Sequence, residues 1–283
     1  MPIQFSPIVA SRAMGEDGAF AVWSVELHEL GELASPIASL DHFRVTGRPF
    51  SPHPHAGFSA VTYVFEDSET SLRSRDSLGN DVITGPGGIV WTQAGSGLIH
   101  EEIPAENHRE LHGLQIFVNL SSENKLVAPQ MLRLENRQVP EWRNNAGNRV
   151  RVLTGDFEGV SSPLAPAEPF NLFDVHLQRS ISLPVADGDN AVVYVLTGGV
   201  VVRADGWKQR VASEHAMVIH GSDGRVTLES SGSAHLLILS GAQIREPIFT
   251  HGPFIMNEPS QVEAAIARYR NGDMGRLEPF QES

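Results

Sequence analysis

Short strand-like runs dominate this chain and constrain its fold more than any other feature. Between Phe5 and Ser240 these runs alternate with Gly, Pro, Asn and Asp, and no helical period persists for more than two turns. In Val61–Phe65 and Leu114–Leu120 every second residue is apolar, so the apolar side chains of each run share one face. We therefore predict an all-β protein made of sandwiches or barrels, in which these two runs are half-buried strands.

A proline-rich segment near the middle, residues 161–169, interrupts the strand-like texture. Proline cannot donate to a sheet ladder, so we interpret this segment as a connector. Beyond it, Ala191–Leu196 and Val200–Arg203 flank a Thr-Gly-Gly turn and predict a hairpin, and His235–Leu239 predicts a buried strand. Because 283 residues suffice for two medium domains, we expect two β domains of similar size.

One helix is expected near the C-terminus, at residues 259–271. Ser260 and Glu263 have the spacing of a capping box, and Gly272 follows the last expected turn. The residues that share its apolar face are Val262, Ile266 and Tyr269. We expect this helix to dock on a barrel through that face and to carry no chemistry.

Composition excludes several classes of function. The net charge of −13 repels phosphate backbones and no basic block offsets it, so we expect no direct contact with nucleic acid. The chain has no cysteine, which removes disulfides, thiolate nucleophiles and cysteine-bound metals. No apolar run reaches the roughly 18 residues of a membrane span. Residues 1–10 lack the features of a secretory signal, so we expect a cytoplasmic protein, with the nucleus as the alternative in a eukaryote.

Two short segments carry the residues that could perform chemistry. His53 and His55 stand at positions i and i+2, so an extended backbone points both imidazoles to the same side. His100 and Glu102 repeat this spacing, and Glu101 faces the other side. If the two segments are neighbouring strands of a small barrel, all four side chains converge on one interior point.

Three imidazoles and one carboxylate would hold one divalent metal ion and leave two octahedral positions open. Open positions favour a site that binds substrate or dioxygen over a closed structural site. The ligand types fit iron, manganese, copper, nickel, cobalt and zinc, and they do not choose among these metals. A His-Pro-His sequence alone also occurs by chance in a chain with twelve histidines, so the second pair is what strengthens the interpretation.

Several longer segments together identify a known family. The segments are His53–Phe58 with Val61–Tyr63, Arg75–Asn80, Trp91–Glu102, His112–Leu120, Arg245–Pro247 and His251–Asn257. They resemble the pirin family of the cupin superfamily, and the resemblance covers nearly the whole chain. Ala56 and Ser59 depart from this pattern, because the family commonly has a basic residue at the first position and an acidic residue at the second. Neither is one of the four expected ligands, and both bear on the polarity of the pocket.

The resemblance implies a bicupin, in which two antiparallel jelly-roll barrels (double-stranded β-helices) pack face to face. We assign residues 1–140 to an N-terminal metal-binding barrel and residues 141–283 to a degenerate C-terminal barrel with the terminal helix. The family pattern places the ligands at His53, His55, His100 and Glu102, and the metal it implies is iron(II). The second half has no His-x-His, so we expect its histidines to be surface or satisfied core residues: His176, His215, His220 and His235.

The resemblance also suggests what the protein does. The first hypothesis is a quercetin 2,3-dioxygenase, which cleaves a flavonol ring with dioxygen and uses Glu102 as general base. The alternative is an iron-dependent, redox-sensing regulatory protein or transcription cofactor that binds a protein partner with a basic patch. A third hypothesis is a cupin isomerase or small-ligand binder with zinc or nickel, because cupins host many chemistries.

Overall fold

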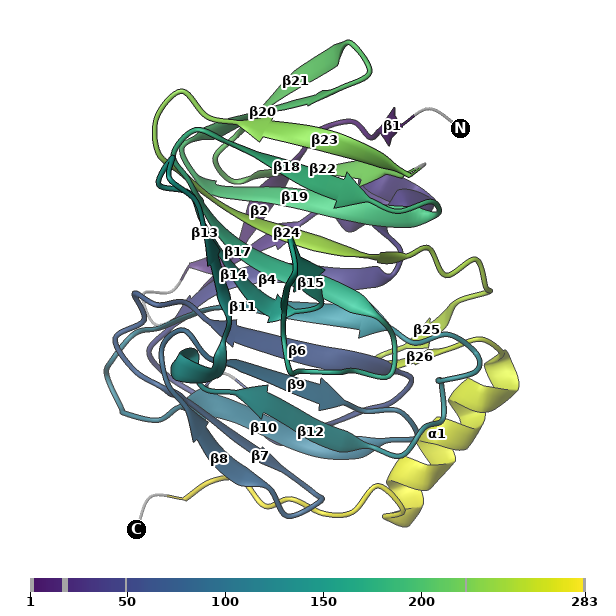
Figure 1. The fold of residues 1–283 in the computed structure, drawn as a ribbon. Coiled ribbons are helices and arrows are strands. Elements are labelled where there is room, and N and C mark those ends of the chain that lie inside the picture. Colours follow the sequence, from purple (N-terminus) through teal and green to yellow (C-terminus); the bar gives the residue numbers. More distant parts are fainter. Residues whose placement is uncertain (1–2, 17–19, 49, 222, 282–283) are drawn as a thin grey trace.

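The computed structural model describes residues 3–16, 20–48, 50–221 and 223–281, and it shows two stacked halves (Figure 1). The first two residues of the stretch tested for a secretory signal lie outside this description. One fourteen-stranded antiparallel sheet runs through both halves, and each half adds a four-stranded sheet that faces it. Among the described residues, no helix is both long and apolar enough to cross a membrane.

The first half comprises β3 to β12. Its part of the large sheet contains β3 (Phe20–Val25), β4 (Ile37–Val45), β6 (Phe58–Val64), β9 (Ile89–Gln93), β11 (Leu111–Asn119) and β12 (Gln130–Leu134). Its small sheet contains β5 (His53–His55), β7 (Leu72–Asp76), β8 (Asp81–Thr84) and β10 (Leu98–Pro104).

The second half comprises β13 to β24. Its part of the large sheet contains β13 (Glu141–Arg143), β14 (Arg149–Thr154), β17 (Phe170–Leu177), β19 (Asp189–Thr197), β22 (His215–His220) and β24 (Ala234–Ala242). Its small sheet contains β18 (Ser180–Val185), β20 (Gly199–Ala204), β21 (Trp207–Ala212) and β23 (Gly224–Glu229). The remaining elements are β1 (Gln4–Phe5), β2 (Val9–Glu16), β15 (Asp156–Phe157), β16 (Val160–Ser161), β25 (Phe249–His251), β26 (Phe254–Met256), the 3₁₀ helices η1 (Leu27–Ala34) and η2 (Asn136–Gln138), and α1 (Pro259–Asn271).

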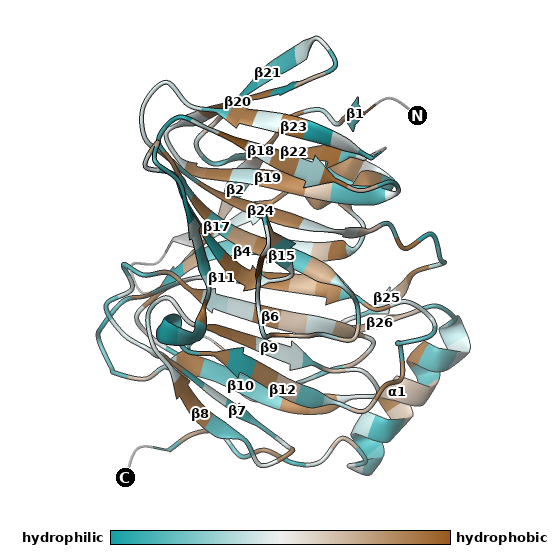
Figure 2. Cartoon of the chain, in the orientation of Figure 1, coloured by the Kyte–Doolittle hydropathy of each residue, from teal (hydrophilic) through white to brown (hydrophobic). Residues whose placement is uncertain are grey.

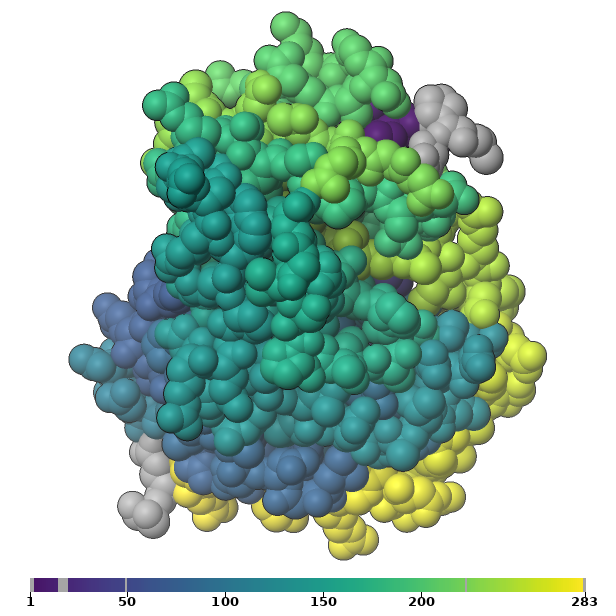
Figure 3. Space-filling view, in the orientation of Figure 1, coloured from purple at the N-terminus to yellow at the C-terminus, as the bar shows by residue number. Residues whose placement is uncertain are grey.

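The two ends of the chain each pack against the more distant half. Strands β1 and β2 pair with β22 of the second half, and β2 then continues along β3 of the first half. At the other end, β26 bridges to Ala56, and α1 packs Val262 and Ala265 against the first half. The yellow C-terminal segment accordingly runs along the blue first half (Figure 3). Both ends therefore tie the halves together.

The largest apolar core lies between the two halves. Val61 and Leu114 of the first half and Tyr194 and Leu237 of the second half belong to this one cluster. Figure 2 shows the apolar residues along the central strands and the polar residues on α1 and the loops. This core explains why the alternating run in β6 is buried on both faces rather than half-buried. One face meets the second half, and the other faces the interior of its own half.

Two further expectations about local structure are wrong. The runs around Thr197, Gly198 and Gly199 do not form a hairpin, because β19 pairs with β22 and β24 while β20 pairs with β21 and β23. The turn instead carries the chain from one sheet to the opposite sheet. The capping box of α1 is also absent, since the helix begins at Pro259 after Glu258 and has no side-chain cap. The end of α1 at Gly272 is confirmed, with φ of 82°.

Candidate metal centre

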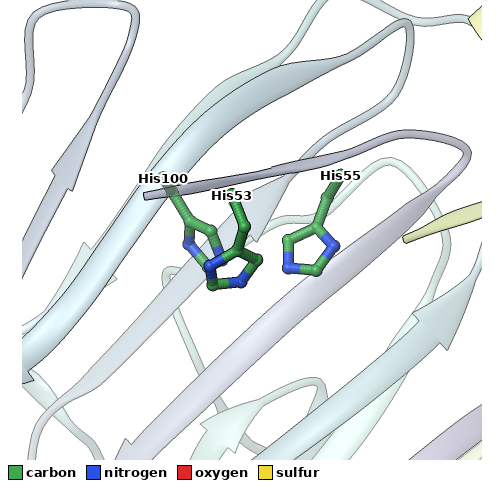
Figure 4. Close-up of side chains that lie close together, drawn as sticks. All are labelled: His53, His55 and His100. Atoms are coloured by element: carbon green, nitrogen blue, oxygen red, sulfur yellow. The ribbon is translucent and has the colours of Figure 1, made fainter. Parts of the chain in front are cut away.

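Three histidines of the first half meet between its two sheets. β5 and β10 are antiparallel neighbours, and His53 lies directly opposite His100. The imidazole centroids of His53, His55 and His100 are 4.7–4.8 Å apart, and one ligand nitrogen from each lies within 4.8 Å of the others. Figure 4 shows the three rings turned toward one another from the two strands. The structure therefore brings together the three histidines predicted from the i, i+2 spacing.

The turn after β5 sets the position of His55. Gly57 has φ of 85°, and a Cβ atom built there would lie 1.9 Å from the carbonyl oxygen of Ile255. Only glycine lets the strand bend so close to the C-terminal segment. The buried Lys125 fixes this bend, because its Nζ donates to the carbonyl oxygen of Gly57 at 2.9 Å and to Oδ1 of Asn119 at 2.6 Å. Burial lowers the pKa of Lys125 to about 8.

Burial keeps two of the imidazoles, those of His55 and His100, neutral. Burial, and then the neighbouring His53, lower the pKa of His55 to about 3. Burial, and then the other two imidazoles, also lower the pKa of His100. His53 Nδ1 donates to the carbonyl oxygen of Ser51 at 2.9 Å, which leaves Nε2 as the free lone pair. Nδ1 of both His55 and His100 is buried without a hydrogen-bond partner among the described residues. Convergent imidazoles with unsatisfied nitrogens fit a divalent transition metal.

Glu102 faces the same interior from β10. Its Oε2 accepts a hydrogen bond from Thr62 Oγ1 at 2.5 Å, and its Oε1 accepts one from Ser74 Oγ at 3.1 Å. Burial raises the pKa of Glu102, against the opposing effect of these two hydrogen bonds. Glu102 does not belong to the group of ligand atoms within 4.8 Å, which comprises the three histidines. The sequence pattern did not indicate Thr62 and Ser74, because they act only through this contact.

A cavity of about 610 Å³ opens onto these four side chains. Its walls are mostly apolar, and its polar groups other than the histidines and Glu102 are Ser24, Asp41 and Gln115. The aromatic side chains that line it are Phe20, Phe43, Phe50 and Phe117. Sequence analysis missed these residues, although Gln115 and Phe117 lie on the opposite face of β11 from the apolar alternation. The volume suits a ligand of drug-like size.

The second half has the same arrangement of strands without the histidines. By strand order, β18 and β23 are the counterparts of β5 and β10. Their inward residues are apolar and fully packed: Ile181, Leu183, Val185, Val226 and Leu228. Of the four histidines in this half, His215, His220 and His235 each have a hydrogen-bond partner. His176 Nε2 is buried and has none among the described residues.

Two opposed sheets in each half, with one group of histidines in the first, define a two-domain cupin with a candidate metal centre. Family models support this class: the "Pirin" model matches residues 27–118, and the "Pirin C-terminal cupin domain" model matches residues 172–275. The human protein named pirin is 32% identical over 273 residues, covering 94% of this chain and 92% of that protein. The chain belongs to the pirin family.

Other relatives carry a name that states an activity. A Pseudomonas aeruginosa protein, named provisionally as a quercetin 2,3-dioxygenase, is 31% identical over 254 residues, covering 85% of this chain and 87% of that protein. A crystal structure of quercetin 2,3-dioxygenase from Acinetobacter baumannii superposes with a TM-score of 0.84 at 25% identity, covering 97% of this chain and 99% of that chain. A crystal structure of a bacterial pirin from Escherichia coli in complex with nickel(II) superposes with a TM-score of 0.65 at 18% identity, covering 86% of this chain and 100% of that chain. This last similarity concerns the fold alone.

Proposed function

We propose that the protein is a metal-dependent dioxygenase that cleaves the central ring of a flavonol such as quercetin with dioxygen. The observation that carries this proposal is the group His53, His55 and His100 beside Glu102 at one wall of an apolar cavity of about 610 Å³. The names of the Pseudomonas and Acinetobacter proteins support the same reaction. Iron(II) is the resident metal we propose; manganese, copper, nickel, cobalt and zinc are alternatives with the same ligand preference.

The three histidines and Glu102 would hold the metal. A bound ion would supply Lewis acidity toward a substrate oxygen and a path for electrons between substrate and dioxygen. The apolar walls exclude water and hold the planar aromatic rings, with Phe43 and Phe117 available for ring contacts. Gln115 and Asp41 line the cavity and would orient the hydroxyl groups of the substrate.

Glu102 is the general base in this proposal. Its place beside the three histidines at the wall of the cavity assigns it this role. Burial raises the pKa of Glu102, and the charge of a bound divalent ion would oppose this effect. It accepts the proton of the enolic hydroxyl group next to the ring carbonyl, and Thr62 and Ser74 hold it in place. Ring opening then releases one carbon as carbon monoxide, and both atoms of dioxygen enter the cleaved product.

The test compares Glu102→Gln with Glu101→Gln, whose carboxylate faces the other side and pairs with Arg75. We expect the Glu102 variant to lose turnover about 100-fold per bound metal, because a glutamine cannot accept the proton. The Glu101 variant should keep the wild-type rate per folded, metal-loaded chain. The measurements are metal content and the loss of quercetin absorbance in the presence and absence of oxygen.

Each outcome has a clear meaning. Oxygen-dependent loss of quercetin that survives in Glu102→Gln at the wild-type rate would reject Glu102 as the base. A wild-type chain that is fully loaded with metal and consumes no quercetin would reject the flavonol reaction. The regulatory hypothesis, in which the metal state alters a protein-binding surface, would then take its place.

A further inference from the structure

A second group of side chains that could ligate a metal lies at the seam between the two halves, on other strands than the first group. Asp174 and His176 are two residues apart on β17, and His235 lies directly opposite His176 on β24. One ligand atom from each residue lies within 4.8 Å of the other two. The spacing is the same as in the first group: an i, i+2 pair on one strand and a histidine on its neighbour.

The contacts of these residues leave one ligand atom without a partner. His235 Nε2 donates to Oδ1 of Asp174 at 2.5 Å. His176 Nε2 is 3.9 Å from the same oxygen and 3.8 Å from Oε2 of Glu66, and it is buried without a hydrogen bond to any described residue. The two imidazole rings stack with centroids 4.3 Å apart and an interplanar angle of 15°. This nitrogen is therefore free to take a further ligand.

The surroundings hold Asp174 as a ligand would be held. Tyr63 of the first half donates its hydroxyl proton to Oδ2, and Arg151 donates to the Tyr63 hydroxyl oxygen at 2.7 Å. Outer hydrogen bonds of this kind orient metal-ligating carboxylates. The Asp174 side chain is 1% exposed, whereas those of His176 and His235 are 37% and 24% exposed, although the Nε2 atom of His176 itself is buried.

The corresponding place in the first half shows the contrast. There β4 and β11 are the counterparts of β17 and β24, and Arg44 lies opposite His112 in the same way that His176 lies opposite His235. The Arg44 guanidinium forms an ion pair with Glu110. A guanidinium has no lone pair to offer a metal ion, whereas a neutral histidine at the corresponding place has one. Arg149 and Arg151 lie near the second group, and both face Glu66 and Glu141.

We propose that Asp174, His176 and His235 form a second metal site, which binds a borderline divalent transition-metal ion such as zinc, cobalt or nickel. Imidazole and carboxylate ligands suit these ions, and Glu66 of the first half is the nearest further carboxylate. Metal–ligand bonds of about 2.0–2.2 Å place neighbouring ligand atoms about 3.3 Å apart, within 1 Å of the observed 2.5 Å and 3.9 Å contacts. The stacked imidazoles must rotate on binding, because an ion lies in the plane of each ring that ligates it. The ion replaces the proton on His235 Nε2, which passes to solvent.

The site has a structural role in this proposal. Its three ligands belong to the second half, and both Tyr63 and Glu66 belong to the first half. Ion binding therefore stabilises the seam between the halves. This inference departs from the expectation that His176 and His235 are only surface or satisfied core residues. It does not depend on the proposed dioxygenase activity.

The test uses cobalt(II) as the probe and the full chain in which His53, His55 and His100 are all replaced by alanine. We expect this chain to bind one cobalt(II) by equilibrium dialysis, with visible absorption bands of a nitrogen- and oxygen-ligated ion. Adding His176→Gln should weaken binding at least tenfold, because it removes one direct ligand. The matched control, His251→Gln, replaces an exposed histidine outside both groups and should leave the affinity unchanged.

The triple-alanine chain could fail to fold, so His176→Gln and His251→Gln are also compared in the chain that keeps His53, His55 and His100. There we expect two bound cobalt(II) ions, and one in His176→Gln. His176→Gln should keep the wild-type quercetin turnover, which separates this site from the first one. Equal cobalt(II) affinity in the His176 and His251 variants, or no cobalt(II) bound to the seam at tens of micromolar, would overturn the proposal.

Discussion

In the second half, β19 and β24 direct Val193 and Ile238 toward Leu183 of β18 and Leu228 of β23, and these apolar side chains fill the space between the sheets. In the first half, the counterpart strands enclose histidines, Glu102 and a cavity of about 610 Å³. The strand order is shared, and the interiors differ. A sheet sandwich is stable when its interior is packed, so one packed half can support a neighbour whose interior is kept open for a ligand.

The two halves pack directly against each other at the seam. The apolar cluster that includes Tyr63, Trp91, Tyr194 and Leu239 lies between the two parts of the large sheet, on the outer face of each half's part. The first half therefore gains its apolar burial on the outside of its large sheet and keeps polar groups on the inside. A strand such as β6 is therefore buried on one face by the second half and on the other by the interior of its own half. We expect substitutions inside the two halves to have different consequences.

The largest expected effect concerns the metal. Replacing His53, His55 and His100 together with alanine should remove one equivalent of bound metal per chain and leave the circular dichroism spectrum unchanged. The fold does not need the ion, because the apolar cores are independent of the three imidazoles. Elemental analysis beside the His215→Ala control, a histidine of the second half, checks this. Full retention of metal in the triple variant would break the comparison, since the first interior would then not be a metal site.

The next effect concerns stability. Ile238→Ala removes a fully buried side chain from the packed interior, so it should lower the free energy of unfolding by about 3 kcal/mol and Tm by roughly 5–10 °C. Gln115 lines the open cavity, so Gln115→Ala should change the free energy of unfolding by less than about 1 kcal/mol. Thermal and denaturant unfolding of both variants measure this. Equal losses would mean that the first interior is as tightly packed as the second.

The smallest effect concerns pH and sharpens the comparison at the seam. Burial, and then His112 and Arg44, lower the pKa of His42 to about 3, and the ring lies 6.4 Å from Tyr194 of the second half. The unfolded chain binds this proton near pH 6.5 and the folded chain does not, so stability is complete above that pH and falls as pH drops toward 3. As the pH drops from 6.5 to 5, this one histidine lowers the free energy of unfolding by about 2 kcal/mol.

His42→Gln keeps a hydrogen-bonding side chain beside His112 and removes the titration. We expect this variant to lose less stability than the wild type between pH 6.5 and 5, by Tm or by denaturant midpoint. Parallel pH profiles of the two proteins would show that His42 is protonated in the folded state. Burial at the seam would then not lower the pKa of His42.

Much of the site could be predicted from the sequence. The i, i+2 spacing of His53 with His55 and of His100 with Glu102 requires only extended backbone to place each pair on one face. The strand texture predicted an all-β fold, and Gly272 predicted the end of α1. These features are local, because alternation and helix termination depend on a few neighbouring residues.

Only the tertiary structure decided the remainder. The turn at Thr197–Gly199 looks like a hairpin in sequence, yet it joins opposite sheets, because strand pairing depends on partners dozens of residues away. Both faces of β6 are buried, because the second half covers one of them. The cavity and the Asp174–His176–His235 group also depend on strands from distant segments. Residue type and spacing therefore determined which groups share a face, and packing between distant segments decided what each face meets.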